Sequence, residues 1–314
     1  MPHFPIDDDD IAAGRALRTE FARFWSTEQG DPRDVYDRFI AATPVADGVT
    51  VDHVDDDPAR GTWVRPADAA PDRAVLFLHG GGYGVGSAAA YAGFVSQLAV
   101  HTGAPFFALD YPLAPEARVP EALDLAVATL ARLCQSHAAV AIVGDSAGGG
   151  LSLATAARAH RERLAPSAVA VFSPWTDLGL SGASMREFAI GDPLLDPAYL
   201  RASAAAYLGS ASADDPRASP LFDTKDGLPP LLIQVGSDEI LLDDSRRFAS
   251  AIEKNGGIVE LEEWQGMHHV FQLNVTQLAT ARKAVSRAGA FLARHLDGDQ
   301  ESSSVASRVV INPA

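Results

Sequence analysis

The sequence predicts an α/β fold in which a mostly parallel sheet is covered by helices on both faces. Eight short apolar runs are typical of strands, and helical stretches separate the later ones, which is the pattern of strand–helix–strand crossovers. The chain has 314 residues, of which 47% are hydrophobic, and this suffices for one large α/β domain with a small cap. We therefore expect an eight-stranded sheet and no second globular domain.

Two amphipathic helices are expected before the first strand. Apolar residues recur at helical spacing within 17–25 and 35–39, and the turn-forming residues 30–32 separate the two groups. The strands are then expected at residues 49–54, 61–65, 74–78, 105–110, 140–144, 169–172, 231–235 and 258–264. The helices between and after them are expected at residues 88–102, 120–136, 147–163, 242–254 and 275–296.

The segment between residues 175 and 229 interrupts this alternation. More than fifty residues rich in Ala, Ser, Asp and Pro connect one strand to the next, which is too long for an ordinary loop. A helical pattern lies within the segment at residues 197–208. We expect the insertion, about residues 176–229, to form part of a cap, and the polar residues 297–314 to form a loose tail.

Composition and charge argue against several classes of partner. The formal net charge is −16 at pH 7, whereas binding to phosphate groups needs clustered Lys and Arg, so no nucleic-acid partner is expected. The N-terminal residues lack the basic and apolar regions of a secretory signal, and no long apolar span occurs, so we expect a cytoplasmic protein without membrane contact. The acidic run from Asp7 to Asp10 lacks the spacing of a calcium loop, and we expect it to stabilise the N-terminus of the following helix.

The most informative motif is GDSAG at residues 144–148, which ends a strand-like run and opens an alanine-rich helical stretch. A serine on so sharp a turn needs small neighbours two residues away on each side, here Gly144 and Gly148. The turn exposes the hydroxyl of Ser146 and puts the backbone N–H of Ala147 at a helix N-terminus, where negative charge is stabilised. The motif therefore predicts a nucleophile together with half of an oxyanion hole.

A second glycine-rich turn, HGGGY at residues 79–83, directly follows the predicted strand at residues 74–78. Without Cβ atoms, the backbone amides of Gly81 and Gly82 can approach a tetrahedral oxyanion closely. We expect these two amides to form the second half of the oxyanion hole.

Two more motifs, DYPLAPE at residues 110–116 and GMHHVF at residues 266–271, complete an ordered set of four. With this set the sequence resembles the hormone-sensitive-lipase-like family of α/β-hydrolase carboxylesterases over about residues 74–272. The resemblance implies an α/β-hydrolase fold, with residues 46–296 as the catalytic domain. It also implies that the helices within residues 1–45 help to form a cap over the acyl pocket.

The resemblance assigns the general base. The family pattern G-M-x-H puts the catalytic histidine at His269 and leaves His268 in the variable position. His269 should accept the proton of Ser146 and later return it to the leaving alcohol. The adjacent histidines have no further ligand at a suitable spacing, so no metal site is expected.

The third member of the triad is open between two carboxylates. The family usually has D-x-L-x-D after this strand, and alignment on Leu241 and Asp243 puts Glu239 at the catalytic position in place of an aspartate. A glutamate can accept the imidazole N–H if the backbone lies about one methylene further back. Asp238 is the alternative, and Asp243 and Asp244 are expected to cap or charge the following helix.

Several other residues near the motifs invite a catalytic interpretation but are expected to be structural. Asp145 precedes the nucleophile on a tight turn, so its side chain should point away from Ser146 and bind neighbouring loops. Asp110 and Glu116 should fix the loop beneath the site. Trp175 is expected either to line the pocket or to pack in the core.

Together these residues predict a serine carboxylesterase. Ser146 would attack the ester carbonyl, His269 would move the proton, and Glu239 would orient the imidazole, after which water hydrolyses the acyl-enzyme. We expect a small ester with a short to medium acyl chain as the substrate. The same triad would serve a lactone, an acetylated metabolite or an arylamide, because the pocket selects the acyl group. No cofactor is expected, and a homodimer is left open.

Two other classes of function are compatible with the fold. A non-catalytic ligand receptor that resembles this family would lack the histidine found at His269. An interfacial lipase would be expected to carry a strongly apolar lid, whereas the segment 175–229 is mixed and acidic. Hydrolysis of soluble p-nitrophenyl esters would separate the enzyme from the receptor, and activity on dispersed triglyceride would identify the lipase.

Overall fold

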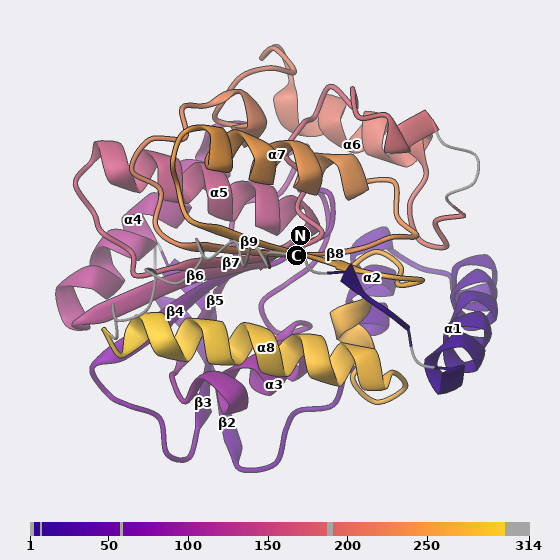
Figure 1. Cartoon of the computed structure of the whole chain (residues 1–314), viewed down its shortest axis with the longest axis horizontal. Helices are drawn as coiled ribbons and strands as arrows, with labels where there is room; N and C mark the ends of the chain where they lie inside the picture. The colour runs from indigo at the N-terminus through magenta and orange to yellow at the C-terminus, as the bar shows by residue number, and fades with distance from the viewer. Residues whose placement is uncertain (1–2, 7, 57–58, 187–190, 299–314) are drawn as a thin grey trace, which may run out of the picture.

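A nine-stranded sheet forms the centre of the computed structural model, which describes residues 3–6, 8–56, 59–186 and 191–298 (Figure 1). The order of the strands is β1-β9-β8-β7-β6-β4-β5-β3-β2, and only the pairs that include β3 are antiparallel. The strands are β1 (His3–Phe4), β2 (Val49–Asp56), β3 (Ala59–Pro66), β4 (Arg73–Leu78), β5 (Phe106–Leu109), β6 (Ala139–Asp145), β7 (Val169–Phe172), β8 (Leu231–Gly236) and β9 (Val259–Trp264).

All eight predicted strands are present, so the predicted α/β-hydrolase fold is confirmed. The additional strand, β1, contains only two residues and pairs in parallel with the edge strand β9. The ring of Phe4 stacks on Trp264 of β9 with 4.2 Å between the ring centroids. Two residues are too few to produce a periodic pattern, and for this reason the sequence did not reveal β1.

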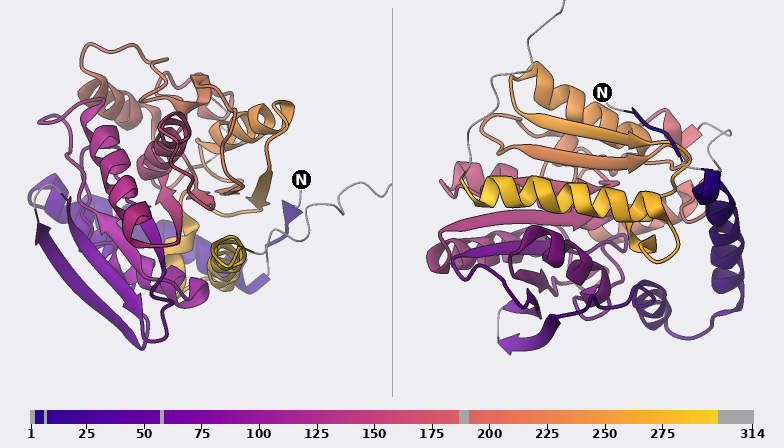
Figure 2. Two further views of the ribbon diagram at one scale, coloured as in Figure 1. Left: turned by 90° about the vertical axis from the view of Figure 1, so that its left-hand side faces the viewer. Right: turned by 60° about the horizontal axis from the view of Figure 1, so that its bottom comes forward.

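Helices cover both faces of the sheet (Figure 2). α4, α5 and α7 lie on one face, and α3 and α8 lie on the other (Figure 1). The helices are α1 (Asp8–Thr27), α2 (Pro32–Ile40), α3 (Ala92–Thr102), α4 (Glu121–Ser136), α5 (Ser146–Arg161), α6 (Pro197–Leu208), α7 (Leu242–Lys254) and α8 (Ala279–Leu296), with the short 3-10 helices η1 (Ser184–Arg186), η2 (Pro220–Phe222) and η3 (Phe271–Asn274). Among the described residues, no helix has both the length and the apolar character needed to cross a membrane.

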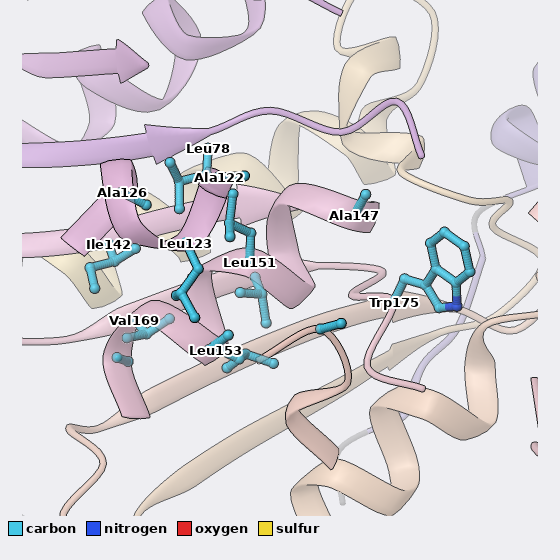
Figure 3. Close-up of a cluster of buried hydrophobic side chains, with 14 of the residues drawn as sticks. Leu78, Ala122, Leu123, Ala126, Ile142, Ala147, Leu151, Leu153, Val169 and Trp175 are labelled. Carbon is cyan, nitrogen blue, oxygen red and sulfur yellow. The ribbon is translucent and has the colours of Figure 1, made fainter. Parts of the chain in front are cut away.

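The central strands are buried on both faces and divide the core into two layers. Along β4, Leu76 and Leu78 point to the side of α4 and α5, while Val75 and Phe77 point to the side of α3 and α8. Figure 3 shows part of the first layer, in which Leu123 of α4 and Leu151 of α5 lie close to strand residues. The two layers hold the carboxyl ends of the parallel strands rigidly in place.

The last helix begins four residues later than the sequence pattern predicted. The carboxylate of Asp10, in the first turn of α1, accepts hydrogen bonds from the backbone amides of Ala279 (2.9 Å) and Thr280 (2.6 Å), the first two residues of α8. Asp8, Asp9 and Asp10 lie in the first turn of α1 as expected, and Asp7 lies outside the described residues. Asp10 therefore serves two helix N-termini, of which the sequence indicated only the nearer one.

The predicted cap elements lie together beyond the carboxyl ends of the parallel strands. α1, α2 and α6, the last with the predicted bounds, line one cavity with residues from the ends of β4, β6 and β9. The division into residues 1–45, 46–296 and an insertion at 176–229 stays a prediction. Of the predicted tail, residues 299–314 lie outside the described part of the chain.

Candidate active site

Ser146 lies at a sharp turn between β6 and α5. Its backbone adopts a left-handed conformation with φ of 52°, which is strained for a residue with a Cβ atom. A Cβ atom on Gly144 would lie 2.4 Å from the carbonyl oxygen of Gly148, and one on Gly148 would lie 2.1 Å from the carbonyl oxygen of Leu78. Both glycines are therefore required for the close packing of this turn.

Ser146, His269 and Glu239 form one hydrogen-bonded row. Nε2 of His269 lies 2.9 Å from Oγ of Ser146, and Nδ1 lies 3.2 Å from Oε1 of Glu239. The three side chains are buried and come from loops after β6, β9 and β8, respectively. A nucleophile next to a base that a carboxylate orients is the arrangement that activates a serine hydroxyl.

Glu239 is held by two further hydrogen bonds on its other oxygen. Oε2 accepts from the hydroxyl of Ser173 at 2.7 Å and from the backbone N–H of Gly236 at 3.0 Å. The Ser173 hydroxyl also accepts from the backbone N–H of Val270 at 3.1 Å, so it joins the glutamate to the loop that carries His269. Ser173 was not identified in the sequence, although its place directly after β7 is a signal that could have indicated it.

Asp238, the alternative carboxylate, does not contact His269. One of its oxygens forms an ion pair with Arg18 of α1 at 2.8 Å, and the other accepts from the hydroxyl of Ser237 at 2.8 Å. Its side chain is 39% exposed, whereas that of Glu239 is fully buried. Between the two candidates, only Glu239 has the geometry of a triad member.

Asp243 and Asp244 lie in the first turn of α7, so the expectation that they cap or charge this helix is confirmed for the charge, but no side-chain hydrogen bond caps the helix. Oδ2 of Asp244 accepts from the backbone amides of Thr176 (2.8 Å) and Asp177 (2.9 Å), and Asp243 accepts from the amide of Ser184 at 3.0 Å. Asp244 is completely buried, and its carboxylate accepts hydrogen bonds from two backbone amides of the insertion. Buried amides of this kind need a partner. The two carboxylates thus fasten the start of the insertion to α7.

The charged form of His269 is favoured by its surroundings. Burial alone would lower the pKa of His269, but the hydrogen bond and the negative charge of Glu239, helped by Asp192 and Asp145, outweigh this effect and raise the pKa. Asp192 was not identified in the sequence; its carboxylate accepts from the backbone N–H of Ile240 at 3.0 Å and so braces the residue after Glu239. A histidine with a raised pKa accepts the proton of the serine readily.

His268 points away from the triad. Its Nε2 atom lies 2.9 Å from Oδ1 of Asn274, and the ring of Phe21 of α1 packs on it edge-on at 5.1 Å. Burial lowers the pKa of His268 to about 4, so the ring is neutral at physiological pH. Within the described part of the chain, no group of three or more His, Cys, Asp or Glu is arranged to hold a metal ion.

The low pKa of His268 predicts a loss of stability in mild acid. Its pKa falls from 6.5 to about 4 on folding, so the unfolded chain binds the proton more tightly and stability decreases as the pH falls through this range. The loss amounts to about 3 kcal/mol at 1.36 kcal/mol per pKa unit. Asp145 and Asp244, whose pKa values burial raises to about 7, act in the opposite sense, so the wild type alone would mask the effect.

A comparison of the wild type with His268→Gln isolates this contribution. Urea unfolding of both proteins at several pH values between 7 and 4 should show that the wild type loses about 3 kcal/mol more than the variant. If the free energy of unfolding changes with pH in the same way for both proteins, the assignment of the low pKa to His268 is contradicted.

The glycine-rich turn after β4 lies beside Ser146. Gly81 and Gly82 have φ values of 109° and 60°, and a Cβ atom on Gly81 would lie 2.2 Å from the carbonyl oxygen of Val85. Both glycines line the same cavity as Ser146, while Ala147 follows Ser146 as the second residue of α5.

Asp145 binds the neighbouring loops, as predicted. Its Oδ1 atom accepts from the backbone N–H of Gly80 at 2.9 Å, and Oδ2 accepts from the hydroxyl of Tyr91 at 3.0 Å. The turn is further held by Tyr111, whose hydroxyl donates to the carbonyl of His79 at 2.7 Å and whose ring stacks on the imidazole at 4.3 Å. These contacts leave the glycine-rich turn little freedom to move.

The expected loop anchors are also present. Asp110 accepts from the backbone N–H of Ala88 at 2.6 Å, and Glu116 pairs with Arg33 of α2 at 2.6 Å. Trp175 packs in the buried core (Figure 3), and its backbone N–H donates to the carbonyl oxygen of Ser146 at 2.9 Å. Of the two roles considered for Trp175, the structure shows packing.

The cavity in front of Ser146 has a volume of about 450 Å³. Its reactive end contains Ser146, His269, Gly81 and Gly82. Most of its other walls are apolar side chains from α1, α2 and the segment up to α6, which include Trp25, Val35, Phe39, Leu194, Leu195 and Leu200. A mostly apolar cavity with a few convergent polar groups is typical of a small-molecule site.

The chain matches the model of a protein family described as the α/β-hydrolase fold over residues 75–273. It is 40% identical over 281 residues to an acetyl-hydrolase of Streptomyces hygroscopicus, and this alignment covers 85% of this chain and 92% of that protein. It is 37% identical over 245 residues to an esterase of Acinetobacter venetianus, covering 76% of this chain and 80% of that one.

Solved structures agree with these relatives. The crystal structure of an esterase from the bacterial hormone-sensitive lipase family superimposes with a TM-score of 0.86 at 32% identity, covering 91% of this chain and 98% of that chain. The residues that match the family model, 75–273, include both glycine-rich turns and the loops after β8 and β9. On these grounds the chain belongs to the hormone-sensitive-lipase-like family of α/β-hydrolase carboxylesterases.

Proposed function

We propose that this carboxylesterase cleaves small esters through an acyl-enzyme on Ser146, with His269 as the general base and Glu239 as its orienting carboxylate. The observation that carries the proposal is the continuous row of hydrogen bonds from Ser146 through His269 to Glu239, at 2.9 and 3.2 Å. A row of this kind couples the removal of the serine proton to a base that is already aligned.

In the first half of the reaction, Oγ of Ser146 attacks the ester carbonyl carbon while Nε2 of His269 takes the hydroxyl proton. The carbonyl oxygen becomes an oxyanion, and the backbone amides of Gly81, Gly82 and Ala147 donate hydrogen bonds to it. The C–O bond to the alcohol then breaks, and the imidazolium returns its proton to the leaving alkoxide. In the second half, His269 takes a proton from a water molecule, whose oxygen attacks the acyl carbon. The bond between this carbon and Oγ of Ser146 then breaks, the imidazolium returns its proton to Oγ, and the carboxylic acid leaves.

The cavity supports a preference for short to medium acyl chains. About 450 Å³ with apolar walls holds a small ester but not a long lipid chain together with its alcohol. Lactones, acetylated metabolites and arylamides stay within the same chemistry. The hydrogen-bonded His269 argues against a receptor that has lost its base.

Hydrolysis of p-nitrophenyl acetate, butyrate, octanoate and dodecanoate tests the proposed substrate class. We expect kcat/KM to be highest for one of the three shorter esters and to fall for the dodecanoate, because its acyl chain and its nitrophenyl group together compete for the same cavity of about 450 Å³. Activity that increases up to the dodecanoate, or that requires dispersed triglyceride, would instead indicate a lipase.

Replacing Glu239 with glutamine is expected to lower kcat by about four orders of magnitude with little change in KM. The equivalent loss of the orienting carboxylate costs about 10⁴-fold in a serine protease, because the imidazole is then held in the wrong tautomer. Glutamine keeps the size of the side chain, so the two contacts to Ser173 and Gly236 can be retained in part.

Asp238→Asn is the matched control, because it neutralises the adjacent carboxylate, which pairs with Arg18 instead. It should leave kcat within about threefold of the wild type, a change of under 1 kcal/mol in the activation barrier. If Asp238→Asn loses its activity while Glu239→Gln stays active, the triad carboxylate is Asp238.

The cytoplasmic location and the homodimer stay predictions. Fractionation of the producing cells tests the first, and light scattering coupled to size-exclusion chromatography tests the second. A small-molecule ester as substrate fits the esterase family to which the chain belongs.

A further inference from the structure

Three polar side chains outside the triad, the buried Tyr91 and Asp145 and the partly buried Tyr36, form a second row beside Ser146. The hydroxyl of Tyr36 lies 2.9 Å from that of Tyr91, and the hydroxyl of Tyr91 lies 3.0 Å from Oδ2 of Asp145. The other oxygen of Asp145 accepts from the backbone N–H of Gly80, the first glycine of the turn that also contains Gly81. The row therefore runs from the cap helix α2 to the glycine-rich turn.

The direction of these hydrogen bonds follows from counting protons. Each tyrosine hydroxyl has one proton, and when Asp145 is ionised, as it is above its pKa of about 7, Tyr91 donates its own proton to that carboxylate. The Tyr91 oxygen must then accept from Tyr36. Burial and the nearby charge of Asp145 raise the pKa of both phenols well above the ordinary value, so both keep their protons.

The glycine-rich turn has no free space against this row. A Cβ atom on Gly80 would lie 2.3 Å from Oδ2 of Asp145 and 2.9 Å from the hydroxyl of Tyr91. Gly80 therefore packs against both side chains without room for a Cβ atom, and its N–H is bonded directly to Asp145, so a displacement of Asp145 acts on Gly80 through this hydrogen bond. Gly81 and Gly82 follow immediately in the chain and line the cavity.

Tyr36 is the one member of this row that belongs to the cap. It lies on α2 and lines the 450 Å³ cavity, so a bound acyl group can contact the helix that carries it. Arg33, one turn earlier on α2, reaches the same turn by a second route and donates to the carbonyl oxygen of Gly84 at 3.0 Å. The helix thus holds the turn near both of its ends.

We propose that Tyr36 is a positioning residue which, through Tyr91 and Asp145, aligns the amides of Gly81 and Gly82 for the oxyanion. The inference rests on the oxyanion role proposed above for these two amides. Tyr36 does not touch the reacting atoms, and its contribution is the alignment of donors that are used in the transition state.

Tyr36→Phe removes only the hydroxyl and is expected to lower kcat for p-nitrophenyl butyrate about tenfold, with KM within about twofold of the wild type. The loss is smaller than the ~10²–10³-fold loss for one complete oxyanion donor, because the amides are displaced and not removed. The affinity for a trifluoromethyl ketone, which forms a tetrahedral adduct with a serine, should fall by the same factor as kcat/KM.

A double-mutant cycle distinguishes a connected row from separate structural effects. Tyr91→Phe interrupts the row next to Asp145, so adding Tyr36→Phe should cause no further loss of kcat. Independent losses that multiply in the double variant would overturn the proposal. So would a Tyr36→Phe variant that changes KM alone or retains the full kcat.

Tyr207→Phe is the matched control. Tyr207 lies on α6 and stacks on Tyr83 of the glycine-rich turn at 3.9 Å, but its hydroxyl has no hydrogen-bond partner among the described residues. Its kcat should equal that of the wild type. If Tyr91→Phe does not fold, the kcat values of Tyr36→Phe and Tyr207→Phe still test the role of Tyr36, because only the first should be lowered.

The proposed function and this inference fail in different ways. A wild-type protein without esterase activity, or with activity that survives Ser146→Ala, contradicts the proposed function. An active, Ser146-dependent wild type with a Tyr36→Phe variant of equal kcat contradicts only the role of Tyr36.

Discussion

Replacing Ser146 with alanine is expected to lower ester hydrolysis by several orders of magnitude while the fold is retained. Removal of the serine nucleophile in the protease subtilisin costs about 10⁶-fold in kcat, and the row of Ser146, His269 and Glu239 has the same logic. Alanine also carries a Cβ atom, so the φ of 52° at this turn is no more strained in the variant. Initial rates with p-nitrophenyl butyrate and the circular dichroism spectrum measure the two outcomes.

Covalent labelling provides an independent check of the nucleophile. A phosphonate ester or a sulfonyl fluoride should modify the wild type on the tryptic peptide that contains Ser146 and leave Ser146→Ala unmodified. A label on another serine would show that the nucleophile has been assigned incorrectly.

His269→Ala should be nearly as damaging as the loss of Ser146, because the members of a triad act as a unit. His269 is the only one of the two adjacent histidines whose ring lies within 2.9 Å of the Ser146 hydroxyl. The measurement is kcat with the same ester, after a thermal melt has shown that the variant is folded.

His268→Gln is the control for this variant. His268 bonds to Asn274 and packs against Phe21, so its replacement should reduce stability more than it reduces kcat. The reverse order, with His268→Gln inactive and His269→Ala active, would show that the base is His268.

Local patterns in the sequence were sufficient to predict the eight main strands and the two glycine-rich turns. These features arise from short-range rules: apolar runs form buried strands, and turns without space for a Cβ atom require glycine. Ser146 lies on such a turn, so the turn itself indicated the nucleophile. His269 was distinguished from His268 by the G-M-x-H pattern of the family that the sequence resembles. The assignment of Glu239 depended on aligning Leu241 and Asp243 with the family pattern, which usually has an aspartate at this position.

Contacts between distant segments could not be predicted in this way. Asp244 follows the local rule for a helix N-terminus in its position, yet its carboxylate binds the amides of Thr176 and Asp177, 68 and 67 residues away in the chain. Ser173 is one serine among many until β7 brings it beside Glu239. Such partners are determined by tertiary packing, which carries no periodic signal in the sequence.

The attachment of the N-terminal segment has a consequence for recombining related esterases. Phe4 stacks on Trp264, Arg18 pairs with Asp238, and Asp10 binds the amide of Thr280 at the start of α8. Trp264 and Thr280 flank the loop that carries His269, and the backbone N–H of Asp238 donates to the carbonyl oxygen of Met267 in that loop. A chimaera that exchanges only the N-terminal segment through α2, β1 included, separates each of these side chains from its partner. A crossover between homologues therefore has to transfer Trp264, Asp238 and Thr280 together with the N-terminal segment. Otherwise the loop that carries His269 loses contacts that hold it in place.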